Sequence, residues 1–183
     1  DKMPQSHASS GPESATALSA RAMALAQAKR FEEAAEVYKK LIAMGPADLQ
    51  ALNNLGFILT SLGRHEEALA YLRQSLSNEP NAVQTLTNLS IVLRELNRLE
   101  EALDCQRKIV VLNPRHPEAV CNFALTLSQL GRDEEAVGQF EKALALRPDF
   151  AAAHYHCGLA LAKLERHEEA LGHYRRAVAL DPA

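Results

Sequence analysis

The chain has 183 residues, 47% of them hydrophobic, which is enough apolar surface to exclude a disordered protein. Its formal net charge is −3 at pH 7, whereas binding to phosphate backbones normally needs a concentrated basic face, so nucleic acid is not expected as a partner. Only 5% of the residues are aromatic and tryptophan is absent, so the core must be built from Leu, Ala, Val and Ile, whose small side chains suit closely packed helices.

The first segment, DKMPQSHASSGPES, has two prolines, one glycine and four serines and no periodicity, which predicts a flexible leader over residues 1–14. From Ala15 onward the sequence favours helix and is interrupted at a fixed interval. We expect one repeat domain over residues 15–183, with repeats at 15–48, 49–82, 83–116, 117–150 and 151–183.

The interval is 34 residues, and proline marks it at Pro46, Pro80, Pro114, Pro148 and Pro182. The motif Arg-x-Glu-Glu-Ala recurs in the same register, beginning at Arg30, Arg64, Arg98, Arg132 and Arg166. A period of roughly 20 to 50 residues is typical of a repeat architecture.

Each repeat is predicted to be a helix-turn-helix, as residues 49–82 illustrate. Leu52, Leu55 and Leu59 fall on one face of a first helix, which ends at Gly63. An acidic pair then occupies the first turn of a second helix, where the amide dipoles stabilise negative charge. Pro80 ends this second helix, because proline disfavours helix in the residue before it.

A small residue interrupts the apolar face of each first helix, at Ala22, Gly56, Ser90, Ala124 and Gly158. In period, in this small residue, in the alanine of the second helix and in the terminal proline, residues 15–183 resemble the tetratricopeptide repeat family. The first repeat is the poorest match, since Arg21 stands where the others have an apolar residue. The resemblance implies an all-α fold, a right-handed α-solenoid of five such repeats whose first helices line a concave groove.

The groove side of each first helix follows from the angle of about 100° per residue. In the sixth place of the repeats stand Asn54, Asn88, Asn122 and His156, which we call the ladder. Asparagine can donate to and accept from a peptide main chain, and a similar ladder holds substrate backbone in tetratricopeptide glycosyltransferases that modify serine and threonine. The alternative is that asparagine serves helix packing at this place.

In the ninth place stand Met23, Phe57, Ile91, Leu125 and Leu159, which we call the stripe. An apolar stripe suits an amphipathic helix or an apolar peptide, unless its side chains pack against the neighbouring repeat. Family members that clamp a chaperone C-terminus need lysine in the second place, but this chain has Gln50 and Gln84 there. We exclude the clamp and include both glutamines among the candidate peptide-binding residues.

No catalytic, metal or cofactor site is predicted. His154, His156 and Cys157 lie close in sequence, but adjacent helical residues point in different directions, so these three cannot converge on one ion. Nothing orients a histidine toward a cysteine for catalysis. We therefore expect a chain that is not itself an enzyme.

Three cysteines, Cys105, Cys121 and Cys157, are an odd number without C-x-x-C spacing, which favours a reducing, cytoplasmic location. No run approaches the roughly 18 apolar residues of a membrane span, so membrane insertion is not expected.

Three functions remain. The first is an interaction scaffold that binds a peptide or helix of a partner protein in the groove. The second is the substrate-docking arm of a larger enzyme, such as a Ser/Thr O-glycosyltransferase. The third is self-assembly through the terminal repeat, because no polar capping helix follows Pro182. The same observation would fit a fragment of a longer protein.

Overall fold

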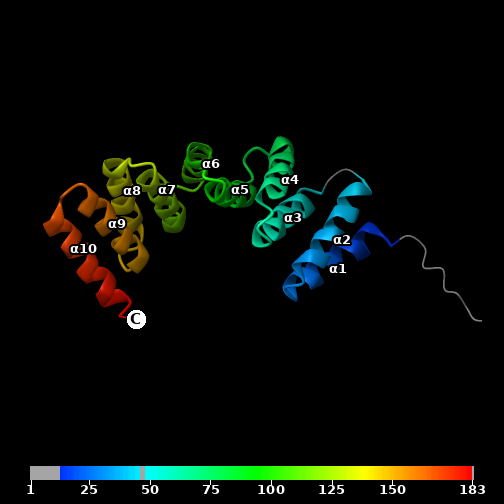
Figure 1. Ribbon diagram of the computed structural model, residues 1–183, viewed down its shortest axis with the longest axis horizontal. Coiled ribbons are helices and arrows are strands. Elements are labelled where there is room, and N and C mark those ends of the chain that lie inside the picture. Colours follow the sequence, from blue (N-terminus) through cyan, green and yellow to red (C-terminus); the bar gives the residue numbers. More distant parts are fainter. Residues whose placement is uncertain (1–12, 46–47, 183) are drawn as a thin grey trace, which may run out of the picture. The chain divides into compact units, whose positions relative to one another are not determined.

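The computed structural model describes residues 13–45 and 48–182, and in these ranges it contains ten α-helices and no strand (Figure 1). The expected all-α fold of successive helix pairs is confirmed. The helices are α1 (Ala15–Gln27), α2 (Phe31–Ala43), α3 (Leu49–Ser61), α4 (His65–Asn78), α5 (Val83–Glu95), α6 (Leu99–Leu112), α7 (Pro117–Gln129), α8 (Asp133–Leu146), α9 (Ala151–Lys163) and α10 (His167–Leu180).

Contacts divide the chain into an N-terminal block that ends at Tyr71 and a C-terminal block that begins at Leu72, inside α4. In the N-terminal block α1 packs on α2 and α2 on α3. In the C-terminal block each helix from α5 to α10 packs on the next, and α7 also touches α9 (Figure 1). This is the contact pattern of a repeat protein, in which an element touches chiefly its neighbours in sequence.

The leader predicted over residues 1–14 lies outside the described residues except at Glu13 and Ser14. Ser14 is the N-cap of α1, and its side chain accepts a hydrogen bond of 3.2 Å from the Ala17 N–H. Such a cap satisfies one of the amides that a helix start leaves unpaired. Pro46, the first of the periodic prolines, also lies outside the described residues.

The turn inside each repeat has one residue in the left-handed region, at Lys29, Gly63, Asn97, Gly131 and Glu165. The next residue then donates its N–H back to a leucine carbonyl five residues earlier, as Arg64 does to Leu59 at 2.8 Å and Arg132 to Leu127 at 2.9 Å. This is the Schellman ending of a helix, which satisfies carbonyls of its last turn. Gly63 thus ends α3 as predicted, while Lys29 and Glu165 do the same work without glycine.

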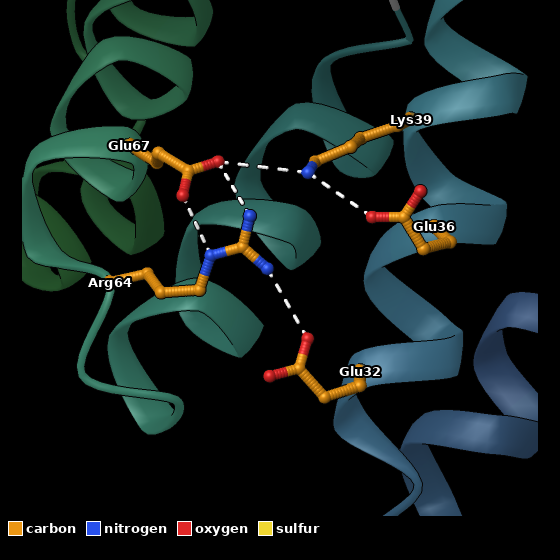
Figure 2. A network of polar contacts seen from close by, with 5 residues as sticks. All are labelled: Glu32, Glu36, Lys39, Arg64 and Glu67. Atoms are coloured by element: carbon orange, nitrogen blue, oxygen red, sulfur yellow. Dashed lines mark hydrogen bonds and ion pairs between the residues drawn. The ribbon is translucent and has the colours of Figure 1, made fainter.

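In every Arg-x-Glu-Glu-Ala motif the arginine pairs with the second glutamate, and at Arg64 and Arg166 it also reaches the repeat before. Within the motif, Arg64 donates to both carboxylate oxygens of Glu67, at 2.6 and 2.8 Å. Its third nitrogen lies 3.2 Å from Glu32 on α2, and Lys39 links Glu36 to Glu67 (Figure 2). The hydrogen bond from Arg64 lowers the pKa of the Glu67 carboxyl. Glu67 thus pairs with the arginine of its own motif and with Lys39 of the preceding repeat, whereas Glu32 pairs with the arginine of the next repeat. Glu134 and Arg166 form the same kind of pair between repeats.

The core of the C-terminal block holds α7 to α10 together. Fully buried members include Phe140, Leu127 and Leu161, and alanines at the close contacts are completely covered, as at Ala124 and Ala136. Close packing of this kind leaves one face of α7 and α9 fixed against the second helices. On these two helices the ladder and stripe residues are less buried than the core: Asn122 and Leu159 are exposed, and Leu125 and His156 are half-buried.

Candidate functional site

The ladder residues lie on the first helix of four consecutive repeats, but their surroundings differ. Asn54 is half-buried, and its Nδ2 donates a hydrogen bond of 3.2 Å to the hydroxyl of Tyr38 on α2. Asn88 and His156 are half-buried as well, whereas Asn122 is exposed. Asn54 thus has a partner inside the protein, and Asn122 presents its amide to solvent.

A ladder residue contacts the second helix of the preceding repeat in two places. Tyr38 reaches Asn54 in this way, and on α8 the ring of Phe140 lies parallel to the ring of His156, with centroids 6.4 Å apart and planes at 15°. Burial lowers the pKa of His156. Tyr38 and Phe140 both stand in the twenty-fourth place of their repeats. This place therefore helps to position the ladder, a role that sequence reasoning missed.

The stripe is largely accessible. Phe57 is 52% exposed, Met23 43%, Ile91 42% and Leu159 38%, while Leu125 is partly buried against the core of the C-terminal block. Four of the five stripe residues are therefore exposed, and apolar side chains that gather in one patch mark interaction sites.

Ladder and stripe meet in a pocket of about 180 Å³ within the N-terminal block. Its lining includes Met23 and Phe57 of the stripe, Asn54 of the ladder, and Tyr38. A polar pair thus stands beside two exposed apolar side chains. A bound segment could insert an apolar side chain here while its main chain reaches the side-chain amide oxygen of Asn54.

A second pocket, of about 230 Å³, lies among α5, α6 and α7. Asn122 lines it, together with the buried Gln106 and with Glu118. The carboxylate of Glu118 forms an ion pair with Arg147 and lies 3.1 Å from Nδ1 of His116. A hydrogen bond from its own backbone N–H, and then the hydrogen bond from Arg147, lower the pKa of Glu118. Sequence reasoning did not single out Gln106, although it is the one amide in the twenty-fourth place of the repeats.

The second-place glutamines are both exposed on the first turn of their helices. Gln50 donates its backbone N–H to the Asp48 side chain at 3.0 Å, which caps α3. Gln84 lies at the start of α5. Neither side chain lines the pockets on the ladder, so their assignment to peptide binding stays a prediction.

Three titratable side chains of the last repeat come together in a way that sequence spacing did not indicate. His173 on α10 has its Nδ1 3.0 Å from Nδ1 of His154 and its Nε2 3.8 Å from Sγ of Cys157. Burial raises the pKa of the Cys157 thiol to about 12 and lowers the pKa of His173, which neighbouring His154 lowers further. A thiol held protonated is a poor nucleophile. Within the described ranges, no group of three or more His, Cys, Asp or Glu residues could hold a metal ion.

None of the helices that the structure describes has the length and apolar character needed to span a bilayer.

Models of the tetratricopeptide repeat match the chain over residues 47–110 and, in a second version, over residues 6–49 and 121–183. The second version alone covers more than half of the chain. The chain belongs to the tetratricopeptide repeat family. Tetratricopeptide repeats are protein-interaction modules, so this family membership makes a protein-binding role the expected one.

Solved structures of MamA share this tetratricopeptide fold. MamA 41-end from Desulfovibrio magneticus RS-1 has a TM-score of 0.88 at 21% identity, covering 94% of this chain and 97% of that one. MamA of AMB-1 has a TM-score of 0.77 at 26% identity, with 90% and 96% covered. MamA of MSR-1 has a TM-score of 0.81 at 24% identity, with 92% and 97% covered. These likenesses support the fold. No curated protein sequence matches the chain.

Proposed function

We propose that this chain is a non-catalytic scaffold that binds a peptide or helix of a partner protein along the ladder and the stripe. The observation that carries the proposal is the exposure of the stripe, which reaches 52% at Phe57, beside a ladder residue in one pocket. Covering exposed apolar side chains stabilises a complex by about 25 cal/mol per Å² of apolar area, before the costs of ordering are subtracted.

The ladder adds hydrogen bonds that do not depend on the partner's sequence. Asn122 is exposed, and an asparagine amide both donates and accepts, so it can pair with a peptide carbonyl and N–H together. Within each block, the exposed stripe residues then select for apolar side chains of the partner. The three free cysteines support a reducing, cytoplasmic setting for this interaction.

The test compares matched apolar-to-charged variants of the whole chain. A binding partner is first isolated from the source organism, and its dissociation constant is then measured for wild type, Phe57→Glu, Ile91→Glu and Val111→Glu. Val111 is 74% exposed on α6, outside the stripe, and controls for a new charge on an apolar surface site. We expect the two stripe variants to weaken binding by roughly tenfold or more, the loss that follows from removing an interface contact worth over about 1.4 kcal/mol.

Thermal melting accompanies each binding measurement. All three variants replace exposed side chains, so their stabilities should stay within about 0.5 kcal/mol of wild type. If Val111→Glu abolished binding while both stripe variants retained it, the interface would lie on the second helices and the proposal would be wrong. Asn88→Ala with Asn122→Ala tests the ladder in the same assay, with weaker binding and an intact fold expected.

A second candidate function is self-assembly through α10. Val178 is 65% exposed and Leu171 42% exposed on this helix, which packs against α9. Two copies that met on these side chains would cover them both. Light scattering over a range of concentrations should then show a rising mass that Val178→Glu suppresses. A mass of one chain at every concentration eliminates this candidate.

A further inference from the structure

The twenty-fourth place of the repeats holds a large apolar or aromatic side chain in four cases and an amide in one. The residues are Tyr38, Leu72, Gln106, Phe140 and Tyr174. Tyr38 is 2% exposed and Phe140 is fully buried, so the ring is buried in the first and fourth repeats, while Tyr174 in the last repeat is half-buried. Gln106 is equally buried, at 3% exposed, but it is smaller than a ring and polar. The second and third repeats therefore have no ring at this place, and of these two only the third has a polar residue.

The pocket of about 230 Å³ lies where Gln106 replaces the ring. Val83, Ile109 and Ala119 give it apolar walls. Its other lining residues are polar: Thr87, Ser90, Gln106, Asn113, His116, Glu118 and Asn122. Pockets for whole small-molecule ligands measure about 300 to 1,000 Å³. This one is therefore the size for a single side chain.

Gln106, which lines the pocket, carries a hydrogen-bond acceptor that nothing in the described part of the chain satisfies. The Oε1 of Gln106 is buried without a partner there. The nearby hydroxyls are already committed as donors, Thr87 to the Val83 carbonyl and Ser90 to the Thr87 carbonyl, both at 2.8 Å. Since a buried acceptor without a partner is unfavourable, an occupant that brings a donor is preferred over a purely apolar one.

The first repeat shows how a ring with a hydroxyl is held at the equivalent place. The ring of Tyr38 is buried and its hydroxyl accepts a hydrogen bond from Nδ2 of Asn54, the ladder residue of the next repeat. Asn122 stands in the same relation to Gln106, and it lines the pocket. A phenol in this pocket would thus find the ladder amide that Tyr38 finds, and in addition the Gln106 oxygen.

We propose that this pocket binds a tyrosine side chain of the partner polypeptide, supplying from outside the ring that the third repeat lacks. The ring packs against Val83 and Ile109, the hydroxyl donates to Oε1 of Gln106, and it accepts from Asn122. The source of the tyrosine rests on the proposed peptide-binding function, whereas the preference of the pocket for a phenol does not.

A lysine or arginine fits this pocket less well. A buried cation needs a carboxylate partner. The carboxylate at the pocket, that of Glu118, is already paired with the guanidinium of Arg147. Gln106 and Asn122 are neutral, so a neutral donor matches them.

The test uses p-cresol, the side chain of tyrosine as a free molecule, and toluene, which lacks the hydroxyl. Both are titrated into the isotope-labelled full chain, and the NMR signals of the Gln106 side-chain amide and the Ile109 methyl groups are followed. We expect p-cresol to give saturable shifts of both signals. Toluene should bind roughly five- to tenfold more weakly, the loss expected for about one hydrogen bond.

Variants locate the binding. Gln106→Phe refills the pocket with the ring used by the fourth repeat and should abolish the shifts of Ile109, whereas Gln74→Phe adds a ring on an exposed site of α4 and should leave them unchanged. Asn122→Ala changes an exposed residue, so it keeps the fold, and it should weaken p-cresol binding. Binding of toluene equal to that of p-cresol, or undiminished shifts of Ile109 in Gln106→Phe, would overturn the proposal.

Binding measurements with the partner protein distinguish failure of this proposal from failure of the proposed function. If p-cresol binds as expected but the stripe variants leave partner binding intact, the groove function fails and the phenol pocket stands. If the stripe variants weaken partner binding, a partner whose tyrosines are replaced by phenylalanine should also bind the wild-type chain more weakly than the unchanged partner does. To Gln106→Phe, the two partners should bind equally well. A partner whose binding is insensitive to all its tyrosines would refute the polypeptide as the source.

Discussion

Gly158 lies directly under the ring of Tyr174, another residue of the twenty-fourth place. A Cβ built at Gly158 would come within 2.7 Å of Cε1 and 2.9 Å of Cδ1 of that ring. Such distances require the ring to move, and Tyr174 packs against the core of the C-terminal block. The small residue that each first helix carries is therefore a steric requirement in the last repeat.

We predict that Gly158→Ala destabilises the protein by about 1–3 kcal/mol, the usual cost of overpacking. The matched control is Gly172→Ala on α10 of the same repeat, where an added Cβ meets nothing within 4 Å. That change should stabilise by up to about 1 kcal/mol, because alanine is the better helix former. Urea unfolding followed by circular dichroism measures both. Equal effects of the two variants would contradict the role given to Tyr174.

At the scale of elements, buried histidines on α9 and α10 make the stability of the fold depend on pH. Burial lowers the pKa of His156 and of His173, and His154 lowers the pKa of His173 further. The unfolded chain takes up these protons near the ordinary histidine pKa of about 6.5. As pH falls below that value the unfolded state binds more protons than the folded state, so the stability that is present above it is lost.

We therefore expect the free energy of unfolding to fall between pH 7.5 and pH 5, and we expect His173→Gln to reduce that fall. Gly172→Ala, on the same helix, changes no titratable group and is the control, which should leave the pH dependence as in wild type. Denaturant melts at several pH values provide the measurement. A pH profile unchanged by His173→Gln would show that this histidine does not carry the effect.

Much of the fold followed from the period, and less of the site did. The turn at Gly63 and the helix starts were predictable, because proline, glycine and the acidic pair act locally. Lys29 and Glu165 adopt the same left-handed conformation without glycine, which only the register of the repeat indicates. The bond between Tyr38 and Asn54 joins two repeats and depends on how α2 and α3 pack, so the sequence of one repeat does not contain it.

In the whole molecule most contacts between helices join neighbours in sequence. A destabilising substitution should therefore affect mainly the helices around it. Phe140 of α8 is fully buried in the core of the C-terminal block. Phe140→Ala should lower the free energy of unfolding by about 3–5 kcal/mol. Hydrogen exchange should then show reduced protection in α7 to α10 and unchanged protection in α1 to α3. Tyr38→Ala is the reciprocal experiment and should reduce hydrogen-exchange protection in α1 to α3 instead. Uniform loss of protection in either variant would mean that the chain unfolds as one cooperative unit.

The contact between the second helix of one repeat and the ladder residue of the next has a consequence for recombination. Tyr38 with Asn54, and Phe140 with His156, are pairs that a cut between repeats separates. A chimera joined near Pro148 would inherit the histidine without its ring partner, whereas one joined at the Gly131 turn would carry both. The segment that can be exchanged as a module is therefore the second helix of one repeat together with the first helix of the next.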